Sequence, residues 1–274
     1  METVMRIALW VLTAVVGLCV GSFLNVVVYR LPEHMSLAKP ASHCPGCGAP
    51  IKWYDNIPVL SYLLLGGKCR HCKCRISPRY LLVELLNAVL WLFCYWRFGA
   101  ASLPYAVLCM AVCSVFICVA LIDFSHRIIF DRFQLILLGL GLIALFLSPR
   151  TLVMTRDELI GNLIEKLIGG VVGYGSFLLI GLLVGKVMKT EALGGGDVKL
   201  AGVAGLFLGW QKLILGVMIA SVGMIFLIGI LRRVRGDERG REYPFAPFLA
   251  IGFTASMLAG DLLIELYTRL LYLV

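Results

Sequence analysis

Charged residues are scarce in this sequence of 274 residues: Asp, Glu, Lys and Arg together make up 15%, against about 25% in an ordinary soluble domain. Hydrophobic residues make up 60%, and the mean hydropathy is +0.93. A water-soluble chain of this length has no interior large enough for so much apolar surface. The composition therefore excludes an ordinary soluble domain and indicates a chain whose main solvent is lipid.

Long polar stretches are also few, because eight apolar segments fill most of the chain. A helix needs about 20 mainly apolar residues to cross roughly 30 Å of hydrocarbon. The sequence therefore predicts an all-α fold, a polytopic membrane helix bundle of about eight transmembrane helices. The predicted segments are residues 7–29, 80–98, 102–122, 128–147, 163–185, 198–210, 212–231 and 246–268. Because the segment 198–210 is short and contains Gly205 and Gly209, seven crossings and a half-span are the alternative.

Acidic residues are fewer than basic ones, 16 against 25, which gives a net charge of +9. The basic residues cluster: eight lie between Arg30 and Arg79, and five between Arg232 and Arg241. Two further loops on the same predicted side carry Arg127, Lys186, Lys189 and Lys199. By the positive-inside rule this side is cytoplasmic, which predicts a multi-pass membrane protein with its basic loops inside the cell. The charge then faces anionic lipid headgroups, and no nucleic-acid partner is expected.

Histidine is rare, with four residues, whereas cysteine is not, with ten. Five cysteines lie in predicted membrane helices, where cysteine behaves as a small hydrophobe. Two CxxC pairs lie in the loop 31–79 and supply Cys44, Cys47, Cys69 and Cys72. Two such pairs are typical of a zinc site with four thiolate ligands. The alternative is a pair of disulfides, which a reducing cytoplasm disfavours.

The cysteine loop has too few apolar residues for a core of its own, and a structural metal supplies the missing stability. Four thiolates leave no open coordination position, so we expect a structural zinc rather than a hydrolytic one. Cys74 is a fifth thiol beyond this set, and His43 and His71 are alternative ligands. The role of Cys74 stays open from the sequence.

Two aspartates lie at the ends of predicted membrane helices on the cytoplasmic side. Asp123 follows Leu121-Ile122, and Asp197 follows the glycines 194–196. Acidic residues beside a membrane span are costly and tend to mark function. Two close carboxylates that share one proton are the machinery of aspartyl proteolysis. The alternatives are that each aspartate is a helix cap or a solvated end residue, or that Asp131 replaces Asp123.

A set of motifs in fixed order extends over nearly the whole chain. Its members are Gly21-Ser22-Phe23-Leu24-Asn25, the two CxxC pairs, Asn56-Ile57-Pro58, Arg79-Tyr80-Leu81-Leu82-Val83-Glu84, Ile122-Asp123, Gly194-Gly195-Gly196-Asp197 and Pro244-Phe245-Ala246-Pro247. The glycine-aspartate motif fits the GxGD pattern of intramembrane aspartyl proteases. The ordered set resembles the bacterial type IV prepilin peptidases, which are bifunctional leader peptidases and N-methyltransferases.

This resemblance implies an aspartic endopeptidase that cleaves the basic leader of prepilins and type II secretion pseudopilins on the cytoplasmic side, after a glycine. The enzyme then methylates the new N-terminal residue, usually Phe, with S-adenosylmethionine. Asp123 and Asp197 are carried over as the catalytic pair. The resemblance divides the chain into a first helix (1–30), a methyltransferase-associated cysteine loop (31–79) and a protease core (80–274). Oligomeric state is not indicated.

Supporting residues are expected around both activities. Gly194 and Gly196 allow a substrate strand to approach Asp197. Lys199 holds a substrate carbonyl or stabilises the neighbouring carboxylate, or else it anchors the helix at the interface. No nucleotide-binding strand–loop–helix motif is present, so the methyl donor needs a site built from the loop and helix ends. Its expected residues are Gly21, Ser22, Asn25, Arg30 and Glu84.

Some positions depart from the family pattern: Phe130 replaces a proline before Asp131, and Ser125 stands where many relatives have an aspartate. Neither change removes a required carboxylate or thiolate. One alternative is a leader peptidase without methylation, against which the four cysteines argue. Another is a proton-coupled transporter, which predicts related halves with broken helices that the sequence does not display. A membrane scaffold leaves the two aspartates unexplained.

Overall fold

The computed structural model describes residues 2–147, 154–188, 193–235 and 243–272. Within these ranges the chain is helical, with no β-strand and only two isolated β-bridges. The chain forms two compact units, Met1–Trp96 (unit 1) and Arg97–Val274 (unit 2). Each is described by itself.

Unit 1 is built on two long helices, α1 (Glu2–Arg30) and α3 (Pro78–Cys94), which pack side by side. Their backbones approach closely at Gly21, where a Cβ atom would lie 2.7 Å from the Cα of Glu84. Only glycine fits such a contact, so the packing of these helices depends on it. The amide of Asn25 adds a hydrogen bond of 3.1 Å to the carbonyl of Tyr80.

The cysteine loop connects α1 to α3 and contains the 3₁₀ helix η1 (Trp53–Asn56) and the five-residue helix α2 (Leu60–Leu64). Ser77 caps the start of α3, where its hydroxyl accepts the backbone N–H of Arg79. Pro78 follows at the first helical position, where its missing N–H costs nothing. At its other end α3 runs into the π-helix η2 (Tyr95–Gly99).

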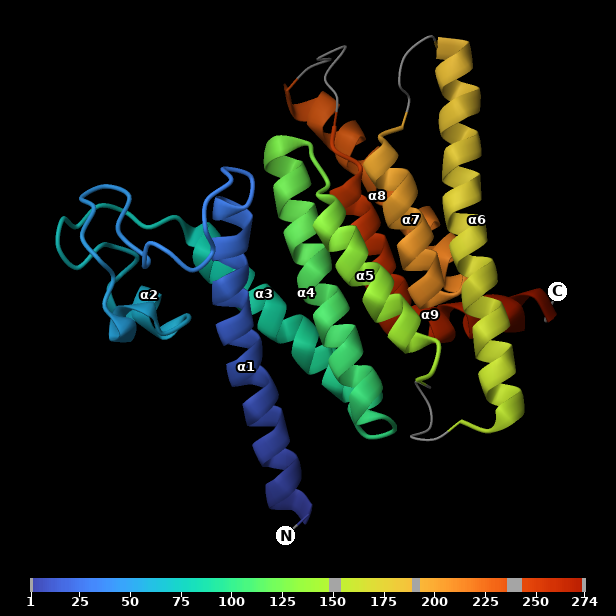
Figure 1. Cartoon of the computed structure of the whole chain (residues 1–274), viewed down its shortest axis with the longest axis horizontal. Coiled ribbons are helices and arrows are strands. Elements are labelled where there is room, and N and C mark those ends of the chain that lie inside the picture. The colour runs from blue at the N-terminus through green and yellow to red at the C-terminus, as the bar shows by residue number, and fades with distance from the viewer. Residues whose placement is uncertain (1, 148–153, 189–192, 236–242, 273–274) are drawn as a thin grey trace. The chain divides into compact units, whose positions relative to one another are not determined.

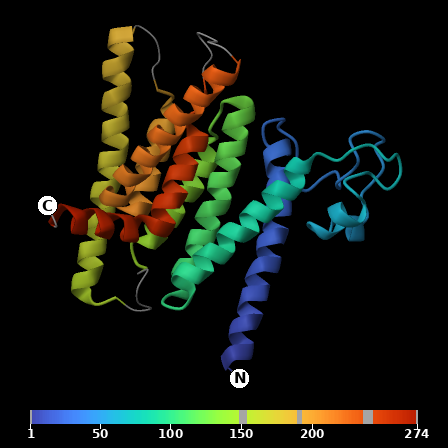
Figure 2. The ribbon, with the colours of Figure 1, turned by 180° about the vertical axis from the view of Figure 1, so that it is seen from behind.

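Unit 2 contains six helices among the described residues (Figures 1 and 2). They are α4 (Leu103–His126), α5 (Asp131–Ala144), α6 (Arg156–Met188), α7 (Gly195–Leu208), α8 (Trp210–Arg235) and α9 (Ala246–Tyr272). The helix α4 lies inside the bundle against α5 and α9, and 72% of its most apolar stretch is buried. The helix α7 packs against α5, α6, α8 and α9.

Glycines bring α6 and α7 into backbone contact. A Cβ at Gly169 of α6 would collide with the carbonyl oxygen of Gly205 on α7, and a Cβ at Gly205 would collide with that of Gly169. One turn further along α6, Gly173 is in the same relation to Ala201. Lipid tails are as apolar as the helix side chains, so the hydrophobic effect does not drive helices together inside a membrane. Close backbone packing of this kind holds them together instead.

All eight predicted apolar segments contain helices, but the predicted count of eight crossings is not confirmed. Six helices of the described chain are long and apolar enough to cross a membrane: α1, α3 with η2, α4, α6, α8 and α9. The helices α5 and α7 have 14 residues each, or about 21 Å at 1.5 Å per residue. The segment 128–147 yields a short helix because Arg127 adopts a left-handed conformation (φ 57°) and the helix restarts only at Asp131.

Candidate active site and cysteine cluster

Asp123 lies in the last turn of α4 and is buried, with 7% of its surface exposed. The helix ends just beyond it because Arg127 takes the left-handed conformation and donates its N–H to the carbonyl of Asp123 at 2.9 Å. The side-chain carboxylate of Asp123 accepts the backbone N–H of Ala246, the first residue of α9. The end of α4 and the start of α9 are thus joined at this carboxylate.

Asp197 lies in the first turn of α7, and its backbone N–H is bonded to the carbonyl of Gly194 at 3.0 Å. Gly196 sits against Ile129, since a Cβ at this glycine would lie 3.0 Å from the Cβ of Ile129. From α5, the buried amide of Gln134 donates to the carbonyl of Gly196 at 3.2 Å. The glycine motif therefore lets α7 begin close to the segment before α5, and Gln134 fixes its backbone.

The two predicted aspartates are brought together. Their carboxyl groups interact electrostatically, although they are 74 residues apart in the chain. Within the described residues, Oδ1 of Asp197 is the buried side-chain polar atom without a hydrogen-bond partner. A buried carboxyl oxygen without a partner is costly unless a proton or a ligand meets it. Two neighbouring carboxyl groups can share a proton, and the unpartnered oxygen of Asp197 can bind a polar group that enters beside it.

Lys199 and Asp131 pair with each other, with 2.7 Å between Nζ and Oδ1. Both side chains are more than half exposed, 52% for the lysine and 71% for the aspartate. Solvent weakens such a pair to about 0–1 kcal/mol. Lys199 thus pairs with the surface Asp131 rather than with Asp197, which favours its interpretation as a surface anchor. The buried Asp123, not Asp131, lies beside Asp197.

Sequence reasoning missed two contributors to this site, Gln134 and Ala246. A glutamine in an otherwise apolar helix is a usable signal, because a buried amide needs a hydrogen-bond partner. Pro244-Phe245-Ala246-Pro247 was noticed as a motif, but its role depends on a backbone N–H, which no residue type reveals.

The cysteine loop folds into two similar turns. In the first, Cys44 N–H bonds to the Ala49 carbonyl at 2.9 Å, and Gly48 N–H bonds to the Cys44 carbonyl at 2.8 Å. In the second, Cys69 N–H bonds to the Cys74 carbonyl at 2.9 Å, and Lys73 N–H bonds to the Cys69 carbonyl at 3.1 Å. The residue after each CxxC pair has a positive φ, 69° at Gly48 and 59° at Lys73. Each turn presents its two sulfurs on one side.

The two turns face each other and bring together the four predicted thiols. All their sulfurs lie within 4.8 Å of one another, in a group made of Cys44, Cys47, Cys69 and Cys72. The Sγ atoms of Cys44 and Cys72 are 3.8 Å apart, which equals the edge of about 3.8 Å of a tetrahedron with zinc–sulfur bonds of about 2.3 Å. The residues therefore fit a zinc ion.

Backbone amides favour the thiolate form at both turns. The N–H groups of Cys47 and Gly46 lower the pKa of the Cys44 thiol to about 6. The N–H of Cys74 likewise lowers the pKa of Cys72. Metal binding requires thiolates, so these amides favour it. The sulfur of Cys74 lies 3.4 Å from that of Cys44, next to the four-sulfur group but outside it.

The residues expected around the methyl donor divide into two places in unit 1. Gly21, Asn25 and Glu84 meet where α1 and α3 touch, with the half-buried Ser22 beside them. Arg30 ends α1, and its guanidinium donates to the carbonyls of residues 36 and 37.

The buried Glu84 has a backbone partner, because its Oε2 accepts the N–H of Val59 at 2.8 Å. The carboxylate of Glu84 is thus bound by a backbone amide at the start of α2.

Comparison with known proteins agrees with this geometry. The model of the Bacterial Peptidase A24 N-terminal domain matches residues 15–98, and that of the Type IV leader peptidase family matches residues 110–229. Proteins named Prepilin leader peptidase/N-methyltransferase are similar over most of the chain. That of Pseudomonas aeruginosa is 37% identical over 280 residues, with 94% of this chain and 92% of the relative covered. That of Pseudomonas putida is 39% identical, with coverage of 91% and 90%. That of Neisseria gonorrhoeae is 34% identical, with coverage of 89% and 90%. No solved structure matches the chain.

Proposed function

The chain belongs to the type IV leader peptidase family, and on this premise we propose that it is a bifunctional prepilin leader peptidase and N-methyltransferase. Its substrates are type IV prepilins and type II secretion pseudopilins. It removes their basic leader after a glycine and then methylates the new N-terminal residue, usually Phe. One observation carries the proposal: the carboxyl groups of the buried Asp123 and the half-buried Asp197 interact at one end of unit 2.

Asp123 and Asp197 are the catalytic residues of the peptidase. The ionised carboxylate takes a proton from water, whose oxygen attacks the scissile carbonyl carbon. The protonated carboxyl donates a hydrogen bond to the carbonyl oxygen, and the peptide C–N bond breaks as the amine takes a proton. The buried Oδ1 of Asp197, which has no hydrogen-bond partner among the described residues, is available to this substrate oxygen or to the water. The N–H of Ala246 holds Asp123 in place.

Glycines and Lys199 support the peptidase site. Gly196 lets the start of α7 lie close to Ile129, and a Cβ at Gly194 would lie 3.6 Å from Oδ2 of Asp197, so the lack of side chains at both positions leaves this carboxyl accessible to an extended substrate strand. Lys199, paired with Asp131, fixes the same end of α7 at the membrane surface.

The peptidase site faces the cytoplasm, in a multi-pass protein of the bacterial inner membrane. The basic loops that flank the ends of α4, α7 and α9 support this orientation through the positive-inside rule; residues 189–192 and 236–242 of these loops lie outside the described residues. We further propose that α5 and α7 lie within the bundle and complete the set of eight membrane helices.

The cysteine loop 31–79 serves the methyltransferase, between the first helix (1–30) and the protease core (80–274). A structural zinc held by Cys44, Cys47, Cys69 and Cys72 gives this loop its stability. Cys74 is left out of the ligand set.

The methyl donor, S-adenosylmethionine, binds in unit 1 beside Ser22, Asn25 and Glu84. A carboxylate and an amide next to a hydroxyl suit the hydroxyl and amino groups of this molecule. Gly21 allows the close approach to Glu84, and Arg30 holds the turn that begins the cysteine loop. When bound, the donor supplies a methyl group to the free amine that cleavage has produced.

The test is the conversion of a prepilin with a Gly-Phe junction by the purified full-length chain, followed by mass spectrometry of the product. Asp123→Asn and Asp197→Asn should each lower the cleavage rate by at least about 10²-fold, because each removes one half of the proton-sharing pair. The matched control is Asp131→Asn, which leaves the buried pair intact and should change the cleavage rate by less than about five-fold, because its exposed ion pair with Lys199 contributes at most about 1 kcal/mol. Cleavage by folded Asp123→Asn and Asp197→Asn variants would refute the assignment.

A further inference from the structure

The five-residue helix α2 has its apolar side chains outside and its polar ones inside. Three of its leucines are at least half exposed: Leu60 at 50%, Leu63 at 62% and Leu64 at 77%. The buried Ser61 donates its hydroxyl to the carbonyl of Tyr54 at 2.9 Å, and Tyr62 donates to the carbonyl of Ile76 at 3.4 Å. A helix on a water-exposed surface has the opposite arrangement. The outer face of α2 therefore suits an apolar medium.

The start of α2 is fixed beside the two long helices of unit 1. The point of contact lies inward of the helix ends to which the cysteine loop is attached. Val59 donates its N–H to Glu84 of α3 at 2.8 Å. Glu84 lies six residues after Pro78, the first residue of α3, or about 9 Å along the helix. Gly21 touches Glu84 from α1 and lies nine residues before Arg30, or about 14 Å from that helix end. Both helices are long and apolar enough to span a membrane.

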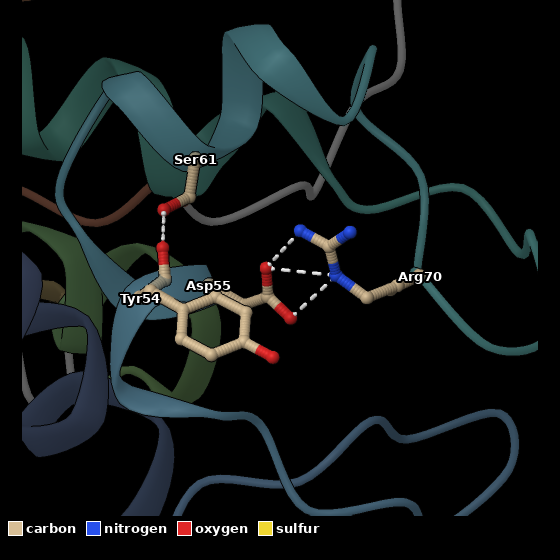
Figure 3. A network of polar contacts seen from close by, with 4 residues as sticks. All are labelled: Tyr54, Asp55, Ser61 and Arg70. Atoms are coloured by element: carbon tan, nitrogen blue, oxygen red, sulfur yellow. Dashed lines mark hydrogen bonds and ion pairs between the residues drawn. The ribbon is translucent and has the colours of Figure 1, made fainter.

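Charges around α2 are arranged as at a lipid–water boundary. Asp55 of η1 is held by Arg70 through hydrogen bonds of 2.6, 2.9 and 3.0 Å, and Ser61 and Tyr54 lie beside this pair (Figure 3). Arg70 thus neutralises the charge of Asp55, so this carboxylate does not repel anionic headgroups. Lys52 and Arg70 each lie 5.6 Å from the ring centre of Tyr54, and the neighbouring Trp53 is 80% exposed. Exposed tryptophans beside cations are typical of membrane interfaces.

We propose that α2 and Trp53 insert into the headgroup–acyl boundary of the membrane and anchor the cysteine loop on the bilayer surface. The occupant of this apolar face is phospholipid. Both ends of the loop continue into membrane-spanning helices, so lipid is always within reach, and the Val59–Glu84 contact sets α2 at the depth of the spanning helices. The anchor holds the cysteine cluster at the surface from which a membrane-embedded substrate presents its N-terminus.

The experiment uses the full-length chain, labelled with 5-fluorotryptophan, in nanodiscs that contain anionic phospholipid. The ¹⁹F resonance of Trp53 is assigned with the Trp53→Phe variant. Two relaxation agents are compared: a phospholipid with a nitroxide near the top of its acyl chain, and a water-soluble gadolinium chelate. We expect the lipid agent to broaden the Trp53 line several-fold more than the gadolinium chelate does.

A triple variant, Leu60→Ser with Leu63→Ser and Leu64→Ser, should reverse that ratio, since it removes the apolar face without touching Ser61. Unchanged thermal unfolding shows that the variant is folded. The matched control is Leu37→Ser, which alters a leucine of the same loop that is 39% exposed and should leave the ratio unchanged.

Two results for the unaltered chain overturn the proposal. A Trp53 line that gadolinium broadens and lipid does not would place this face in water. A line that neither agent reaches would show that protein covers the face, either a second copy or another part of the chain.

Discussion

Gln134 is the side chain that connects α5 to the backbone of the glycine-aspartate motif. It touches neither carboxyl group in the contacts of the described chain, so we regard it as a positioning residue. Its amide donates a hydrogen bond to the partly buried carbonyl of Gly196, one residue before Asp197. Because the orientation of the Asp197 carboxyl depends on the backbone next to it, this hydrogen bond helps to orient that carboxyl.

Replacement of Gln134 by leucine should therefore slow cleavage without weakening substrate binding. A buried carbonyl left without a donor costs about 1–3 kcal/mol, and about 1.4 kcal/mol corresponds to a ten-fold change in rate. We expect kcat to fall about ten-fold with KM almost unchanged, measured by leader cleavage under steady-state conditions. The control is Gln211→Leu, an exposed glutamine at the start of α8. A rise in KM alone would argue against a positioning role.

At the scale of single elements, the contact between α6 and α7 decides where Asp197 lies. Valine at Gly169 would collide with the backbone of α7, whereas valine at Gly175 on the same helix meets no atom within 4 Å of its Cβ. Both substitutions replace a glycine in the interior of α6 by valine, so the difference in intrinsic helix propensity between the two residue types cancels in the comparison.

Gly169→Val should accordingly lower the stability of unit 2 and the peptidase activity, because overpacking typically costs about 1–3 kcal/mol. Gly175→Val should leave both close to their original values. The measurement is thermal unfolding in detergent together with leader cleavage. Equal effects of the two variants would mean that α6 and α7 do not make this contact in the membrane.

The loop elements η1 and α2 depend on the ion pair of Asp55 with Arg70. The Arg70 guanidinium lowers the pKa of Asp55 below its usual value, near 3.9 in the unfolded chain. A lowered carboxyl pKa gives stability that is present above the unfolded value and lost as the pH falls through the folded one. Between pH 8 and pH 5 the pair therefore stays intact.

Trypsin cleavage of the folded chain after Arg70 should accordingly be slow and almost independent of pH from 8 to 5, after correction for the pH dependence of trypsin. Asp55→Asn should speed it several-fold at every pH in this range, because it frees the guanidinium. Glu33→Gln, an exposed acidic residue of the same loop, is the control. The interpretation fails if Asp55→Asn leaves the cleavage rate unchanged.

On the scale of the whole molecule, the four thiols belong to unit 1 and both aspartates to unit 2. Each unit is compact by itself, so the two activities should respond separately to the removal of zinc. The cysteine loop has too few apolar residues for a core of its own, so it needs a metal although most of the chain is apolar.

Treatment with a strong chelator should abolish methylation while leader cleavage continues near its untreated rate. Mass spectrometry then finds cleaved, unmethylated product, and elemental analysis finds a loss of one zinc per chain. Cys44→Ser should reproduce this result, and Cys74→Ser should not, since its sulfur lies outside the four-sulfur group. A parallel loss of cleavage would show that the cysteine loop also supports the peptidase.

The sequence by itself determined the local features of this protein. Apolar runs forced helices at all eight predicted segments, because lipid requires every backbone group to be bonded within its own segment. The CxxC spacing predicted the group of four sulfurs, because each pair forms a tight turn within a few consecutive residues, 44–49 and 69–74, and each turn supplies two sulfurs. The identities of Asp123 and Asp197 as candidates also followed from their positions at helix ends.

Only the tertiary structure decided which groups meet. It paired Lys199 with Asp131 rather than with Asp197, bonded the carboxylate of Glu84 to the backbone N–H of Val59, and placed the N–H of Ala246 against Asp123. It also limited α5 and α7 to 14 residues each. Sequence spacing fixes which residues share a helix face, but contacts between helices depend on which backbones approach closely, and here glycine contacts between distant segments make that choice.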